Sequence, residues 1–156
     1  MRSGGELLGL PAVADGSGRR IGTVADVLFD DACTRVLGVV VRRGRVFTDR
    51  RVIGFSDITT IDRGALMVRD ESASRAPTAD EIGAMAKNRR SMQGKPVVSR
   101  TGSYVGQVAD VLFDESSGDV VGFAVGEPAR TGRWRPRAVL PADLNPVVGR
   151  DVVIGS

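Results

Sequence analysis

The sequence predicts an all-β protein made of two tandem small β-barrels joined by a short linker helix. Three observations support this prediction. The heptapeptide VADVLFD occurs twice without change, at Val24–Asp30 and at Val108–Asp114. Within each copy, short apolar and β-branched runs alternate with turn residues, which is typical of an all-β unit. A helical pattern occurs only between the copies.

The internal similarity extends far beyond the shared heptapeptide. GLPAVADGSGRRIGTVADVLFDDACTRVLGVVV, from Gly9, aligns with GKPVVSRTGSYVGQVADVLFDESSGDVVGFAV, from Gly94. Further on, RVIGFSDITTIDRGALMV from Arg51 aligns with RAVLPADLNPVVGRDVVI from Arg137. Ordered similarity of this kind indicates a duplicated structural unit. We therefore expect one barrel over 5–71, a linker over 72–90 and a second barrel over 91–156.

In the first copy, the expected strands follow one another with turn residues between them. Asp15-Gly16-Ser17-Gly18 and Asp62-Arg63-Gly64 are typical turn sequences, because Gly, Asp and Ser favour turn conformations. The expected strands are Leu10–Ala14, Ile21–Phe29, Val36–Val41, Arg51–Phe55, Ile58–Ile61 and Leu66–Val68. Closure removes exposed sheet edges, so we expect a closed or nearly closed barrel. A unit of this size buries only about 60% of its unfolded surface, which favours close contact between the two barrels.

The linker carries the signals of a helix over Ala79–Arg90. Thr78 is followed three residues later by Glu81, which is the spacing of an N-terminal capping box. Ile82 and Met85 then fall on one helical face. The linker is therefore expected to contain the one helix of the chain.

The composition argues against several classes of function. Apolar residues make up 42% and charged residues 26% of the chain, with a net charge of +3 that is not concentrated in one segment. No apolar run approaches the roughly 20 residues that cross a membrane, so we expect no membrane insertion and a cytoplasmic location. With no His and a single cysteine, Cys33, a zinc site is nearly excluded and general-base catalysis is disfavoured. We expect no metal and no cofactor.

Both copies resemble the PRC-barrel domain family. The shared pattern is [IV]-G-x-V-x-D-V-L-F-D, then V-x-G-[VF]-x-V, then R-x-[VI]-x-x-x-D-[IL], and the resemblance covers Gly9–Val68 and Gly94–Ile154. The resemblance implies a small, strongly bent β-barrel, a role as a docking or adaptor module, and no catalytic residues. The family includes the H subunit of photosynthetic reaction centres and a ribosome maturation factor. This sequence lacks the membrane helix of the first and the N-terminal RNA-processing domain of the second, so neither function can be carried over.

Asp26 and Asp110 interrupt apolar strands, where a charge is costly unless it has a partner. They could form a pseudo-symmetric carboxylate pair, as in aspartic proteases. Those sites require small residues after the Asp, whereas both copies here read Ala-Asp-Val. We therefore interpret both carboxylates as structural acceptors of backbone N–H groups at a bend in the barrel. Gly22 and Gly106, in the same motif, are also assigned structural roles.

One local pattern points to binding. Arginines lie near the hairpins of both copies, and in the second copy they flank the only tryptophan. Arginine beside an aromatic side chain is common in interface hot spots and in RNA stacking sites. The candidate binding residues are Arg43, Arg45, Arg133, Trp134 and Arg135. The alternative interpretation is a solvated hairpin in which arginines pair with aspartates.

These observations lead to two main hypotheses and a weaker third. The first is a non-enzymatic adaptor or docking protein that binds a protein partner and could also form a homodimer. The alternative is an RNA- or ribosome-associated factor that uses the Arg/Trp hairpins. The third is a carboxylate enzyme centred on Asp26 and Asp110. The sequence favours the first and predicts no enzyme activity, and it does not identify the partner.

Overall fold

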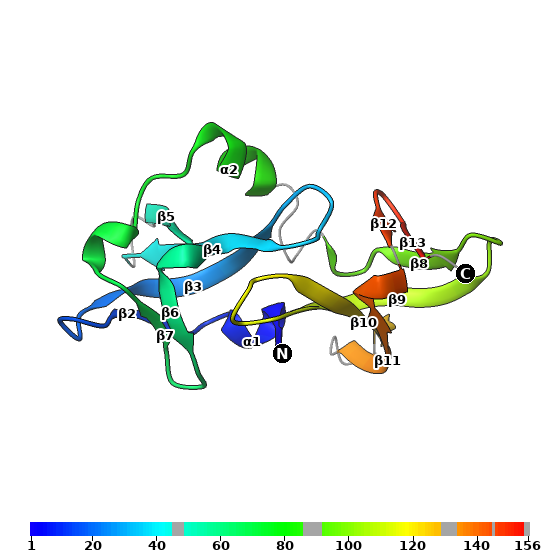
Figure 1. Cartoon of the computed structure of the whole chain (residues 1–156), viewed down its shortest axis with the longest axis horizontal. Coiled ribbons are helices and arrows are strands. Elements are labelled where there is room, and N and C mark those ends of the chain that lie inside the picture. Colours follow the sequence, from blue (N-terminus) through cyan, green and yellow to red (C-terminus); the bar gives the residue numbers. More distant parts are fainter. Residues whose placement is uncertain (45–48, 86–91, 129–133, 145, 155–156) are drawn as a thin grey trace.

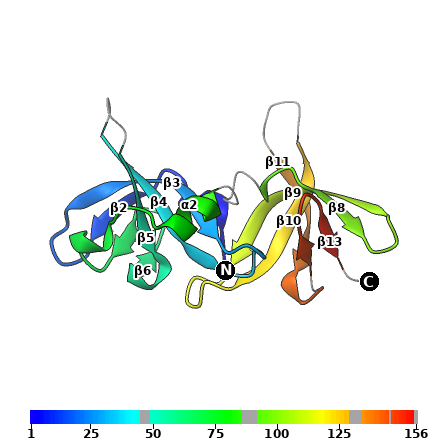
Figure 2. The same cartoon turned by 90° about the horizontal axis from the view of Figure 1, so that it is seen from above.

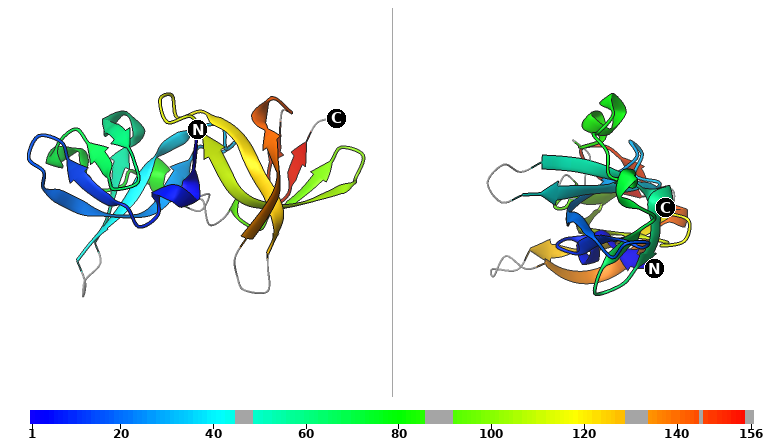
Figure 3. Two further views of the ribbon diagram at one scale, coloured as in Figure 1. Left: turned by 90° about the horizontal axis from the view of Figure 1, so that it is seen from below. Right: turned by 90° about the vertical axis from the view of Figure 1, so that its left-hand side faces the viewer.

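The computed structural model describes residues 1–44, 49–85, 92–128, 134–144 and 146–154, and it confirms an all-β chain with two similar lobes. Figure 1 shows the first repeat on the left and the second on the right, with one helix above the first. The N-terminus lies in the middle of the molecule, where the lobes meet (Figure 3).

The strands of repeat 1 are β2 (Pro11–Ala14), β3 (Arg20–Phe29), β4 (Val36–Arg43), β5 (Asp49–Gly54), β6 (Ile58–Ile61) and β7 (Leu66–Val68). Those of repeat 2 are β8 (Pro96–Ser99), β9 (Tyr104–Phe113), β10 (Val120–Pro128), β11 (Trp134–Pro141), β12 (Val147–Val148) and β13 (Val152–Ile154). The remaining described elements are β1 (Arg2–Ser3), α1 (Gly4–Leu7), α2 (Ala79–Ala84) and the 3-10 helices η1 (Phe55–Asp57), η2 (Glu71–Ala73) and η4 (Ala142–Leu144).

Both repeats have the same connectivity. The first four strands form an antiparallel meander, and a later strand returns to pair in parallel with the first: β7 with β2, and β13 with β8. The described strand orders are β5-β4-β3-β2-β7-β6 and β11-β10-β9-β8-β13-β12, with β1 paired to β9. This return curls each sheet into a barrel-like domain (Figure 2). Among the described residues, no strand pairing joins β5 to β6, so the first barrel is open along that seam.

The helices differ in part from the expectation. In α2, the Glu81 N–H donates to Thr78 Oγ1 at 3.2 Å and the Thr78 N–H donates to Glu81 Oε1 at 2.9 Å, so the predicted capping box is confirmed. The expected helix continued to Arg90, but residues 86–90 lie outside the described residues. The short helix α1 was not predicted. Neither α1 nor α2 is long and apolar enough to span a membrane.

The two repeats share one apolar core and meet with pseudo-two-fold symmetry. Buried side chains of both repeats, including Leu7 and Phe113, belong to the same cluster. In the turns after β3 and β9, the Val36 N–H donates to the Gly118 carbonyl at 2.7 Å and the Val120 N–H donates to the Thr34 carbonyl at 2.8 Å. Each bond is the counterpart of the other in the repeat alignment, which is the pattern of an isologous contact. The repeats are thus in intimate contact.

Candidate functional site

Asp26 and Asp110 lie at equivalent irregularities of the two sheets. The pairing register shifts just before Asp26 in β3 and just before Asp110 in β9. Each carboxylate accepts a hydrogen bond at 2.8 Å from the next backbone N–H, that of Val27 or Val111. Asp110 also accepts from the Gly5 N–H of α1 at 3.0 Å. Both carboxylates thus accept a backbone N–H at a bulge, and Asp110 also links β9 to α1. These are the contacts that a structural role requires.

Gly22 and Gly106 lie where a neighbouring strand approaches the backbone closely. A Cβ on Gly22 would lie 2.9 Å from the Arg42 carbonyl oxygen, and a Cβ on Gly106 would lie 2.8 Å from a methyl carbon of Val125. Any side chain at either position would therefore push β3 or β9 away from its neighbour.

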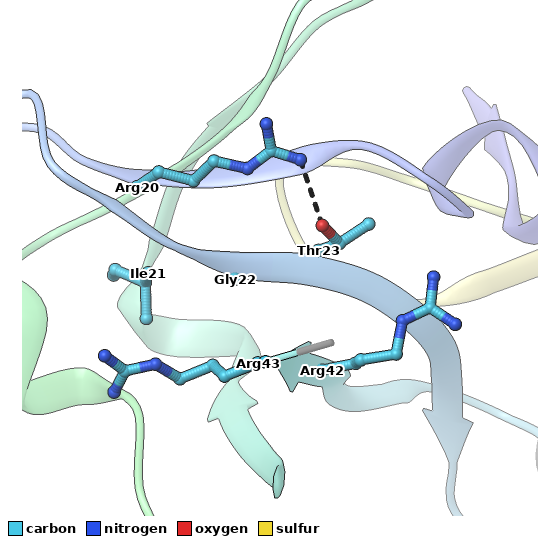
Figure 4. A pocket seen from close by; sticks show the side chains of 7 residues that line it. Arg20, Ile21, Gly22, Thr23, Arg42 and Arg43 are labelled. Atoms are coloured by element: carbon cyan, nitrogen blue, oxygen red, sulfur yellow. Dashed lines mark hydrogen bonds between the residues drawn. The ribbon is translucent and has the colours of Figure 1, made fainter. Parts of the chain in front are cut away.

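A groove of about 670 Å³ lies over Gly22 (Figure 4). Its walls come from the first residues of β3 and the last residues of β4, because the antiparallel register places Thr23 opposite Arg42. Three exposed arginines make this site positively charged, and we call it the arginine groove. Its described lining is Arg20, Ile21, Gly22, Thr23, Arg42, Arg43 and Gly44.

The charge of the arginine groove is not neutralised by carboxylates of the described residues. Arg20 Nη2 donates to the Thr23 hydroxyl at 3.0 Å, a neutral partner. Asp49 lies opposite Arg43 in the β4–β5 register, yet no ion pair joins them. The described ion pairs involve other arginines of the chain. Guanidinium groups bind carboxylate or phosphate oxygens well, so the site can take an anionic group.

Among the described side chains, the second repeat lacks the three arginines of the groove. The same register gives Tyr104 in the place of Arg20, Gly126 in the place of Arg42 and Glu127 in the place of Arg43. At these three positions the positive charge is therefore found in repeat 1 alone. The duplicated fold therefore does not require arginine at these positions.

The structure distributes the predicted binding residues unevenly. Arg43 lines the arginine groove, whereas Arg45 and Arg133 lie outside the described residues. Trp134 and Arg135 begin β11, where only the backbone is described. Arg20 was not among the predicted binding residues. It precedes the expected strand in the sequence, and it lines the same groove as Arg43 because β3 pairs with β4, with Thr23 opposite Arg42.

Two observations on the described residues concern metal binding and the single cysteine. No group of three or more His, Cys, Asp or Glu side chains among them could hold a metal ion. Cys33 is buried, and burial, together with the negative charge of Asp30, raises the pKa of its thiol to about 12. A thiol with that pKa stays protonated near neutral pH and is a poor nucleophile.

Comparison with known families adds one match that covers most of the chain. A family model described as PRC-barrel domain matches residues 1–73 and again residues 86–154. Each match begins before the sequence motif recognised above, and the first includes β1 and α1. A search of curated proteins returned no match.

Proposed function

The chain belongs to the PRC-barrel domain family, with one domain in each repeat, and we propose that it is a non-enzymatic docking protein whose arginine groove binds an acidic segment of a protein partner. The observation that carries this proposal is the set of exposed arginines over Gly22, which no described carboxylate neutralises. A pair of small barrels in a family without catalytic residues fits a binding module.

The chemistry of the lining favours a protein ligand. Each guanidinium group presents a planar fork of N–H donors that matches a carboxylate. The groove is open to solvent and its three arginines are exposed, so an extended acidic segment can enter it without rearrangement of the sheet.

RNA is the competing ligand, because the same arginines attract phosphate groups. Sequence-tolerant RNA binding usually adds aromatic side chains on which bases stack. None of the described residues that line the groove is aromatic. The lining therefore favours carboxylates of a protein over the bases and phosphates of RNA.

The test compares two probes, a fluorescent oligoglutamate peptide and an oligouridine of equal length. The groove variant carries Arg20→Glu, Arg42→Glu and Arg43→Glu. The matched control carries Arg63→Glu, Arg100→Glu and Arg150→Glu, which changes the net charge equally at exposed arginines elsewhere. Exposed ion pairs contribute about 0.2–1 kcal/mol each, so losing three should weaken peptide binding about tenfold.

We expect the groove variant to bind the peptide about tenfold more weakly and the control variant to keep most of its affinity. Equal weakening in both variants would show that only net charge matters, and it would refute a role for the groove. Tighter binding of oligouridine than of oligoglutamate, lost in the groove variant, would replace the protein partner with RNA.

A further inference from the structure

The two repeats differ at one edge of their sheets, between β5 and its counterpart β11. Asp26 pairs with Val40 and Val40 with Val52, while Asp110 pairs with Ala124 and Ala124 with Val139. Val139 therefore occupies the place of Val52. The same register puts Ala138 in the place of Arg51, although the sequence alignment equates Arg51 with Arg137.

The edge of β5 is occupied by a later part of the chain. The Val52 N–H donates to the Arg75 carbonyl at 2.8 Å, and the Arg75 N–H donates to the Val52 carbonyl at 3.1 Å. The Arg51 side chain donates to the Ser74 carbonyl at 2.8 Å and to the Ser74 hydroxyl at 3.1 Å. Residues 73–85, which we call the cover segment, thus begin by extending the sheet of repeat 1.

The cover segment then lays an apolar side chain over the sheet. Met85, just after α2, packs against a small buried cluster that includes Val52. The Arg75 guanidinium donates two hydrogen bonds to the Glu81 carboxylate of α2, at 2.5 and 2.8 Å. Hydrogen bonds from Arg75 hold the pKa of Glu81 at about 2, so this clamp is charged at neutral pH. The strand and helix parts of the cover segment are therefore held together by its own residues.

The corresponding edge of β11 is bare among the described residues. Val52 is 0% exposed, whereas Val139 is 55% exposed. Ala138 is exposed as well, and no described strand or extended segment pairs with β11 on the side away from β10. Figure 1 shows α2 above β4 and β5 and away from β11. The first half of β11 contains Arg135, Pro136 and Arg137, and the strand ends at Pro141. Charged residues and prolines limit pairing at a sheet edge, so the stretch open to an added strand is the apolar one around Val139.

We propose that the outer edge of β11 is a docking site for an extended segment of a partner protein, which pairs with Val139 as an added antiparallel strand. The kind of occupant is inferred from the cover segment, which pairs with Val52 on the equivalent edge of repeat 1 through backbone hydrogen bonds. We expect the partner segment to make the corresponding backbone hydrogen bonds with Val139. Addition of a strand to a sheet edge is a common mode of peptide recognition. Because Ala138 replaces Arg51, the segment at this site needs apolar side chains and not the hydroxyl group that Ser74 offers.

This site is separate from the arginine groove, which lies on repeat 1 and suits acidic side chains. A variant that removes binding at the β11 edge should leave binding at the arginine groove unchanged, and the reverse should also hold. Each of the two sites is tested with its own set of variants. A partner that uses both would be acidic in one segment and apolar and extended in another.

The test uses the full chain and a synthetic peptide with the sequence of the cover segment, residues 73–85, in which Ser74 is replaced by Val to suit the apolar Ala138. Amide hydrogen exchange at Val139 is followed by NMR as the peptide is added. We expect a saturable slowing of about tenfold or more at Val139, because the amide gains a hydrogen bond. Exchange at Val52 should not change, since its edge is already occupied.

The matched variants are Val139→Asp and Val147→Asp, two valines of repeat 2 that are both 55% exposed. Val139→Asp should abolish the protection and Val147→Asp should keep it, while circular dichroism confirms that both variants are folded. Unchanged exchange at Val139 up to the solubility limit of the peptide would overturn the proposal. Amide exchange at Val139 could also become slower in the free protein as the protein concentration is raised. That result would overturn the proposal too, because the edge would then bind a second copy of the chain.

Discussion

Replacement of Leu7 by Ala tests whether the two repeats unfold as one unit. Leu7 is 1% exposed and belongs to the core cluster that includes side chains of both repeats. A buried Leu→Ala change costs about 2–5 kcal/mol, and we expect about 3 kcal/mol because α1 can move partly into the cavity. For a chain of this length, each kcal/mol lowers Tm by about 2–4 °C, so the expected loss is about 6–12 °C.

The assay is urea and thermal unfolding followed by two signals. Far-ultraviolet circular dichroism reports both repeats, and fluorescence of the single tryptophan, Trp134, reports repeat 2. Both signals should shift together and show one transition. The control Ile82→Ala, at a side chain that is 59% exposed, should change stability by less than about 0.5 kcal/mol. A Trp134 transition that stays at its original midpoint would refute the shared core, because repeat 2 would then unfold independently.

Three further predictions concern the side chains of Asp110, Cys33 and Glu81. Asp110→Ala should lower the free energy of unfolding by about 2–4 kcal/mol in urea titrations, since it strips two backbone N–H groups of a charged acceptor. The pKa of Cys33 is raised from its ordinary 9.0 to about 12, so as pH rises the thiol ionises in the unfolded chain before it does in the folded chain. The free energy of unfolding should therefore fall between these two pH values, and this fall should be absent in Cys33→Ala. The pKa of Glu81 is lowered from 4.5 to about 2, so its contribution is present above pH 4.5 and is lost as pH falls towards 2. Glu81→Gln should remove that acid dependence in Tm measurements and cost about 1 kcal/mol at pH 7, a small value because Arg75 is partly exposed.

Most strands could be predicted from the sequence because each is a short apolar run between turn residues. The expected Ile58–Ile61 and Leu66–Val68 have the observed bounds of β6 and β7. The helix α1 was missed because four residues are too few for a helical period. A weak signal was present, since the Glu6 carboxylate accepts from the Ser3 N–H at 3.4 Å, the S-x-x-E pattern of a capping box.

The candidate sites were less visible in the sequence because they depend on contacts between distant residues. Arg43 was predicted from the local cluster of arginines, but Arg20 joins it only through the register of β3 and β4. Val52 and Val139 look alike in the sequence. Their difference arises from the pairing of Arg75 with β5, a contact that no local pattern predicts.

Binding through one repeat and not the other is tested most directly by an NMR titration of the full chain with oligoglutamate. The internal duplication supplies the control, because Gly22 and Gly106 occupy equivalent places. We predict saturable amide shifts at Gly22, Thr23 and Arg43, and none at Gly106 or Glu127. Shifts of equal size in both repeats, or no shifts at low salt, would contradict docking through the arginine groove.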